Sequence, residues 1–120
     1  LCAALETLIA DQIEVIEDVD AYLALDSAFH ERLAAASDNP FLARAAQSMN
    51  VLGIEFRRAS AEAGYAQNRS IEDHRRILAA LKDRRPDAAR EAMRAHMQQV
   101  YTTTRRALDE VSANVSEKKD

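Results

Sequence analysis

Glycine, proline and cysteine are scarce in this chain of 120 residues. It contains 2 Gly, 2 Pro and 1 Cys, whereas average usage would give about 7% Gly and about 5% Pro. Because tight turns depend on glycine and proline, most of the chain must lie in long elements, which we expect to be helices. The single cysteine, Cys2, cannot close an internal disulfide and excludes a metal site built from cysteines. Any metal would have to be bound by histidines and carboxylates.

The sequence also lacks an excess of positive charge and a long apolar run. Its 16 Lys and Arg against 20 Asp and Glu give a formal net charge of −4, which argues against a nucleic-acid-binding surface on this chain. The apolar runs are short and interrupted by charges, so no membrane span is expected. No basic segment followed by an apolar one suggests a secretion signal. We therefore expect a soluble, cytoplasmic protein without a membrane partner.

Apolar residues recur at helical spacing in five segments. Asn39 and Pro40 are typical of a helix start, with Asn39 as the N-cap and Pro40 in the first turn. Ser70 and Asp73 resemble a capping pair that opens a fourth helix, and Pro86 is placed to open the last one. The predicted fold is an all-α antiparallel bundle of about five to six helices; the expected segments are residues 1–18, 21–37 and 40–62 and two stretches opening at 70 and 86.

The first residue already belongs to an apolar helical stripe. Leu1 is not an initiator methionine and falls in phase with Leu5 and Leu8, so we interpret the chain as a fragment of a longer protein that lacks its upstream part. One helical domain is expected over residues 1–115, followed by a disordered charged tail over residues 116–120.

The third predicted helix carries an apolar stripe with a glycine inside it. Periodicity alone leaves open whether this stripe faces the core or a partner subunit. Gly53 in its interior suggests a point where a backbone or a ligand comes close. The stripe consists of Leu42, Ala45, Met49, Leu52 and Phe56.

All three histidines lie within apolar stripes. Asp26 lies four residues before His30, so both side chains project from the same face of one helix, while His74 and His96 belong to two later helices. Taken singly, each of these residues is more often a core or surface residue whose hydrogen bonds are satisfied without a metal. Together, four unpartnered polar groups in a core would be costly, and one divalent metal would satisfy them all. Three histidines and one carboxylate suit zinc, nickel, manganese or iron, with zinc preferred.

Four sequence segments resemble the FCD domain, the effector-binding and oligomerisation domain of FadR-like regulators in the bacterial GntR family. The resemblance covers nearly the whole chain and is closest to the metal-binding branch of that family. The segments are DSAFHERL at 26–33, ASDNP at 36–40, EDHRRIL at 72–78 and AMRAH at 92–96.

This resemblance implies a function for the site. Asp26, His30, His74 and His96 would bind the metal, and a small carboxylate effector would complete its coordination. The parent protein would be a homodimer that contacts DNA only through a winged-helix domain, which this sequence lacks, as it lacks the first helix of the effector domain. Relatives commonly have Gly-Asp where this chain has Arg84-Arg85, and Glu where it has Asp73.

An arginine facing the cavity would suit an anionic effector, because a guanidinium can hold a carboxylate through two hydrogen bonds. Arg57 is the first candidate and Arg58 the alternative; a pair of arginines near a helix end can also be a solvated terminus.

Two functions compete for this ligand set. The first is a ligand-sensing module of a transcriptional regulator, in which metal and effector binding changes the arrangement of the helices. The second is a mononuclear metalloenzyme, either a hydrolase or an oxygenase. The sequence offers no further histidine or carboxylate on a core face to act as a general base, so we expect a sensor and not an enzyme.

Overall fold

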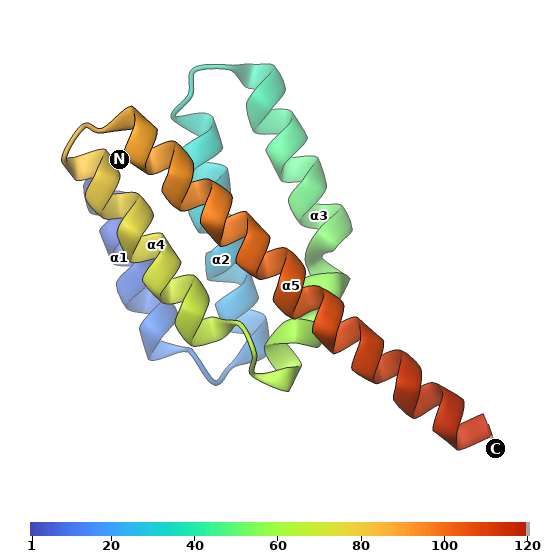
Figure 1. Ribbon diagram of the computed structural model, residues 1–120. Coiled ribbons are helices and arrows are strands. Elements are labelled where there is room, and N and C mark those ends of the chain that lie inside the picture. The colour runs from blue at the N-terminus through green and yellow to red at the C-terminus, as the bar shows by residue number, and fades with distance from the viewer. Residues whose placement is uncertain (120) are drawn as a thin grey trace.

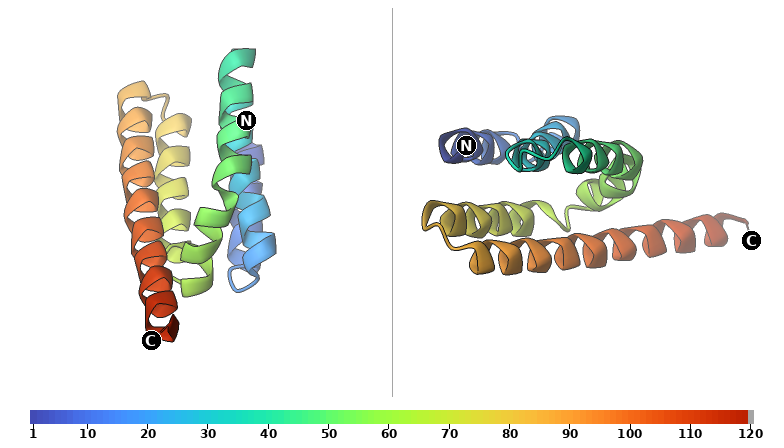
Figure 2. Two further views of the ribbon diagram at one scale, coloured as in Figure 1. Left: turned by 90° about the vertical axis from the view of Figure 1, so that its right-hand side faces the viewer. Right: turned by 90° about the horizontal axis from the view of Figure 1, so that it is seen from above.

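The computed structural model of the protein describes residues 1–119 as five helices and no strand, which confirms the predicted all-α bundle. The first three helices lie side by side in one layer, and the last two form a second layer (Figures 1 and 2). The first layer contains α1 (Cys2–Glu14), α2 (Val19–Ala35) and α3 (Pro40–Ala63), and the second contains α4 (Gln67–Lys82) and α5 (Pro86–Lys119). No helix in this part of the chain is long and apolar enough to cross a membrane.

The core lies between the two layers, where α4 packs against α1 and α3 packs against α5, while α4 and α5 pack against each other within the second layer. Its buried apolar side chains come mainly from α1, α2 and α4. With 34 residues, α5 extends well beyond the rest of the bundle (Figure 1) and makes the molecule 55 Å long. The buried apolar residues are Leu5, Ile9, Tyr22, Leu23, Phe29, Ala61, Ile71, Ile77, Leu78, Ala80 and Ala107.

The predicted start of α3 is confirmed. Asn39 is the N-cap, and its side-chain oxygen accepts hydrogen bonds from the backbone N–H groups of Phe41 and Leu42 at 3.0 and 3.1 Å. The boundary between the first two helices differs from the prediction. Residues 15–18 form a turn, and the carboxylate of Asp18 accepts the N–H of Ala21 at 3.1 Å, so α2 already begins at Val19.

The predicted capping pair at the start of α4 is wrong. The helix begins at Gln67 with no side-chain cap, so Ser70 and Asp73 lie inside it. Both are buried: the hydroxyl of Ser70 donates to Gln99 at 3.3 Å, and the carboxylate of Asp73 contacts His96. Polar residues near a helix start predict caps, whereas here they lie on the core face and bind α5. Asp73 is thus a further carboxylate on a core face, contrary to the expectation that there is none.

Pro86 opens α5 as predicted, but the C-terminal boundary differs from the prediction. The helix continues to Lys119, so residues 116–119 are helical where a disordered tail was expected. The last tail residue, Asp120, lies outside the described residues.

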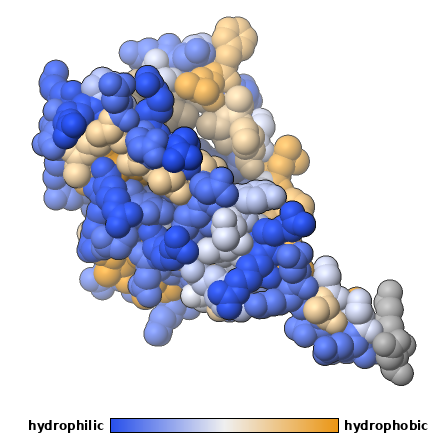
Figure 3. All heavy atoms as spheres, viewed as in Figure 1, coloured by the Kyte–Doolittle hydropathy of each residue, from blue (hydrophilic) through white to orange (hydrophobic). Residues whose placement is uncertain are grey.

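The apolar stripe of α3 is largely exposed on the single chain. Met49, Leu52 and Phe56 are 70%, 76% and 55% exposed, and Figure 3 shows apolar side chains gathered along this helix. This stripe is therefore not part of the core of one chain. No backbone approaches Gly53, because a Cβ placed there would meet no heavy atom within 4 Å; the residue lines an open cavity instead.

Candidate functional site

Three helices bring the histidines together between the two layers. His30 comes from α2, His74 from α4 and His96 from α5, and one nitrogen of each lies within 4.8 Å of the others. The Nε2 atoms of His96 and His30 are 3.3 Å apart. His74 and His96 are completely buried, so the cluster is closed to solvent on all sides except that of His30.

Asp26 lies at the edge of this cluster. Its Oδ1 atom is 3.4 Å from Nε2 of His74 and 3.9 Å from Nε2 of His30. The one-turn spacing along α2 places the carboxylate and the imidazole on one face of the helix. The structure therefore brings the four residues singled out in the sequence to one place.

Two side chains that the sequence did not identify as part of the site orient the histidines. Nδ1 of His96 lies 3.0 Å from Oδ2 of Asp73, and Nδ1 of His74 lies 2.9 Å from Oε1 of Gln12. Because a carboxylate and an amide oxygen only accept hydrogen bonds, each ring carries its proton on Nδ1 and a lone pair on Nε2. Gln12 is in helical phase with Leu5 and could have been found as a polar residue on the core face of α1.

The Nε2 atom of His74 has no hydrogen-bond partner although it is buried. A buried acceptor without a partner costs about 1–3 kcal/mol. The ring of His74 stacks on Phe29 with 4.0 Å between the ring centres, so packing holds this unpaired nitrogen in position.

The environment keeps the imidazoles of His74 and His30 neutral. Burial, together with the neighbouring His30 and His96, lowers the pKa of His74 to about 2. Burial also lowers the pKa of His30, against the opposing effect of Asp26. Neutral imidazole is the form that binds metals.

The donor atoms present suit a transition metal. A tetrahedral ion with bonds of roughly 2.0–2.1 Å requires donors about 3.3–3.4 Å apart. The pairs His96–His30 and His74–Asp26 lie at 3.3 and 3.4 Å, whereas Asp26 and His30 are 3.9 Å apart and the histidine nitrogens are spread over up to 4.8 Å. Metal-bound histidines usually donate their other N–H to a carboxylate or carbonyl, as His96 and His74 do to Asp73 and Gln12. The three histidines could therefore hold a metal ion.

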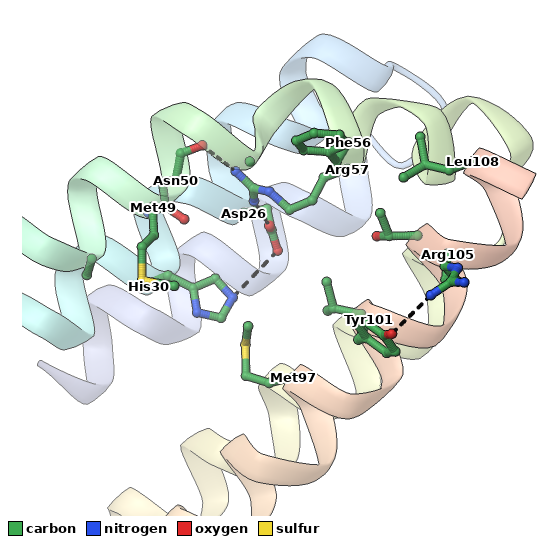
Figure 4. A pocket seen from close by; sticks show the side chains of 14 residues that line it. Asp26, His30, Met49, Asn50, Phe56, Arg57, Met97, Tyr101, Arg105 and Leu108 are labelled. Atoms are coloured by element: carbon green, nitrogen blue, oxygen red, sulfur yellow. Dashed lines mark hydrogen bonds and ion pairs between the residues drawn. The ribbon is translucent and has the colours of Figure 1, made fainter. Parts of the chain in front are cut away.

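A cavity of about 460 Å³ between α3 and α5 reaches the histidine cluster at His30 (Figure 4). Asp26, His30, Asn50 and Arg57 lie together at one side of it, and Tyr101 lies on α5 across from them. The remaining lining is mostly apolar: Ala46, Met49, Gly53, Phe56, Met97, Val100 and Leu108, with Thr104 and Arg105.

The two arginine candidates differ in position. The guanidinium of Arg57 lines the cavity and donates to Oδ2 of Asp26, to Oγ of Ser27 at 3.2 Å and to the backbone carbonyl of Asn50 at 3.3 Å. Arg58 does not line the cavity and instead pairs with the exposed carboxylate of Asp20.

Comparison with known proteins assigns the chain to a family. The family model of the FCD domain matches residues 1–99, which include all four clustered residues and most of the bundle. No curated protein and no solved structure matches the chain. The protein therefore belongs to the FCD domain family, the effector-binding domains of GntR-family transcriptional regulators.

Proposed function

We propose that this protein is a metal-dependent sensor domain in which His30, His74, His96 and Asp26 bind one divalent ion. The observation that carries the proposal is the buried Nε2 of His74, which has no hydrogen-bond partner and lies 3.4 Å from Oδ1 of Asp26. Zinc is the preferred ion because it favours nitrogen donors in a tetrahedral arrangement. Nickel, manganese and iron are the alternatives, and elemental analysis of the protein distinguishes them from zinc.

The effector is a small carboxylate that binds in the cavity next to the metal. The two oxygens of Asp26 face different groups, since Oδ1 is directed to the histidines and Oδ2 to Arg57. Arg57 thus holds a metal-binding carboxylate in place and at the same time lines the cavity with a cationic group. An effector carboxylate would gain charge-assisted hydrogen bonds from this guanidinium.

Effector binding regulates DNA binding through a winged-helix domain of the parent regulator, which acts in the cytoplasm. The sensor changes the helix arrangement only if the effector binds one arrangement more tightly than another. The metal and the effector have a binding role in this proposal and no catalytic one.

The parent protein is a homodimer, and the exposed apolar stripe of α3 supports this part of the proposal. Leu42 and Leu52 of this stripe are 52% and 76% exposed and lie outside the cavity lining. Exposed apolar patches of this kind typically mark interaction surfaces. In light scattering, Leu52→Glu should halve the mass of a dimer, and a mass equal to that of one chain for the unmodified protein would contradict the assignment.

The metal proposal is tested by removing and restoring the ion. Protein treated with a chelator should lose a stoichiometric metal in elemental analysis and melt at a lower temperature, and one equivalent of zinc should restore the melting temperature. His74→Ala and His96→Gln should each abolish this response. A chelator-insensitive melting temperature in metal-free protein would contradict the proposal.

The effector proposal is tested on the reloaded protein. Acetate, succinate and citrate are probes, and at least one should raise the melting temperature of the zinc form but not that of the metal-free form. The same shift in His74→Ala would contradict a metal-bound effector. Chemical conversion of a bound carboxylate, detected by NMR of the mixture, would favour a metalloenzyme instead.

A further inference from the structure

Polar and apolar groups are separated within the cavity between α3 and α5. Asp26, His30, Asn50 and Arg57 form one polar side, next to the proposed metal site. The walls beyond it are formed by thioether, aromatic and aliphatic side chains, among them Met49, Phe56, Met97, Val100 and Leu108. A ligand that fills this space must therefore have one charged end and an apolar body.

Only one further cation lines the cavity, and unlike Arg57 it is largely exposed to solvent. Arg105 donates to the hydroxyl of Tyr101 at 3.3 Å and pairs with Asp109 at 3.6 Å, and its side chain is 64% exposed. Beyond the polar side the walls are mostly apolar, so a second carboxylate, or the several hydroxyl groups of a sugar acid, would lose more hydrogen bonds to water than the few polar atoms of the lining, such as Oγ1 of Thr104, could replace. The cavity thus disfavours di- and tricarboxylates and polyhydroxy acids.

We propose, on the basis of the sensor function above, that the effector is a monocarboxylate with an apolar body. Its carboxylate binds at the side of Arg57 and His30, and its hydrocarbon part lies between Met49 and Phe56 of α3 and Met97 and Val100 of α5. The volume of about 460 Å³ falls in the range of pockets that bind small molecules and accommodates a chain or ring larger than acetate.

A homologous series of carboxylates tests this proposal by calorimetry on the zinc-loaded protein. Acetate, butanoate, hexanoate and octanoate share one head group and differ only in apolar length. Because burial of each CH₂ favours binding, the affinity should rise about three- to fourfold per added CH₂ until the cavity is filled. Octanol should bind far more weakly than octanoate because it lacks the carboxylate.

Gly53 offers a variant that fills the cavity without disturbing the fold. A Cβ at this position meets nothing within 4 Å, and leucine is a better helix former than glycine. Gly53→Leu should keep the acetate affinity but weaken octanoate binding about tenfold or more, because the new side chain occupies the space of the ligand body. Ser48→Leu is the matched control, since Ser48 lies on the exposed surface of α3 outside the cavity lining, and should leave the series unchanged.

The outcomes separate this inference from the sensor function. If citrate or succinate binds the zinc form and affinity does not rise from acetate to octanoate, the apolar-effector inference is overturned and the sensor function stands. If no carboxylate binds with or without zinc, the sensor function itself fails. Leu52 lies outside the cavity lining. If Leu52→Glu abolishes octanoate binding as Gly53→Leu does, the apolar lining of the cavity serves a second copy of the chain and the inference is overturned.

Discussion

The carboxylate of Asp73 on α4 binds Nδ1 of His96 on α5 at 3.0 Å and so fixes which nitrogen of that ring faces the cluster. A carboxylate can only accept this hydrogen bond, so His96 directs the lone pair of Nε2 toward His30, 3.3 Å away. Asp73 is itself buried, and this contact connects the two helices of the second layer. The orientation of a candidate metal ligand therefore depends on a residue that does not touch the metal position.

Asp73→Asn should weaken zinc binding about 10- to 100-fold, the usual effect of removing such a partner. An asparagine amide can donate to Nδ1, which would place the ring proton on Nε2 and block the lone pair. The measurement is competition with a colorimetric chelator. Glu72→Gln is the control, because Glu72 is exposed and pairs only with Arg75, and its zinc affinity should equal that of the unmodified protein. Equal affinities for both variants would show that Asp73 has no role in orienting His96.

Arg57→Gln should lower carboxylate affinity about tenfold or more, because hydrogen bonds to charged groups contribute about 1.5–3 kcal/mol. The measurement is calorimetry with zinc-loaded protein and octanoate or citrate as the probe. Arg58→Gln is the matched control, since the neighbouring Arg58 pairs with Asp20 on the surface and does not line the cavity. A larger loss of affinity for Arg58→Gln than for Arg57→Gln would reverse the assignment.

The metal-free protein should lose stability as the pH falls below about 6.5. The unfolded chain protonates His74 near its ordinary pKa of 6.5, whereas burial lowers the pKa in the folded state to about 2. The neutral ring of His74 therefore makes its full contribution to the free energy of unfolding above the unfolded-state pKa. This contribution falls toward acid pH, by up to about 1.4 kcal/mol per pH unit. His30 acts in the same direction.

Urea unfolding in the presence of a chelator, between about pH 7.5 and pH 5, measures this effect. His74→Gln should show a shallower decline than the unmodified protein over the same range, because its side chain does not titrate. An unfolding free energy of the unmodified protein that stays constant or rises toward acid pH would contradict the burial of a neutral His74.

Arg84→Gly should stabilise the protein by up to about 1 kcal/mol. Arg84 has a φ of 54°, and α4 ends there with hydrogen bonds from Arg84 N–H to Leu81 and from Arg85 N–H to Ala80. This left-handed conformation disfavours any residue with a Cβ and suits glycine. The measurement is the midpoint of denaturant unfolding.

Arg84→Ala is the control for this change, because it removes the same side chain but keeps the Cβ and should bring no gain. The opposite effect is expected at the end of α3, where Gly64 has a φ of 75° and Gly64→Ala should destabilise the protein by about 1 kcal/mol. A stability gain for Arg84→Ala as large as that for Arg84→Gly would attribute the effect to charge and not to the backbone.

Helix positions followed largely from the sequence because their signals are local. Asn39 and Pro40 fix the start of α3 through contacts within three residues, and apolar periodicity identifies the faces that form the core. The prediction for Ser70 is wrong, because the same residue type serves as a cap or as a buried hydrogen-bond donor to a distant helix, here to Gln99. The apolar stripe of α3 was equally ambiguous, since periodicity does not distinguish the core from an exposed face.

The sequence by itself determined the all-α fold, the FCD family and the four polar residues on core faces, because residue type and helical phase are properties of the chain alone. Tertiary structure decided how the site is assembled. The pairings of His74 with Gln12 and of Arg57 with Asp26 join residues 62 and 31 positions apart. Such contacts depend on how helices pack side by side, and this packing brings together residues whose spacing in the sequence carries no trace of their proximity.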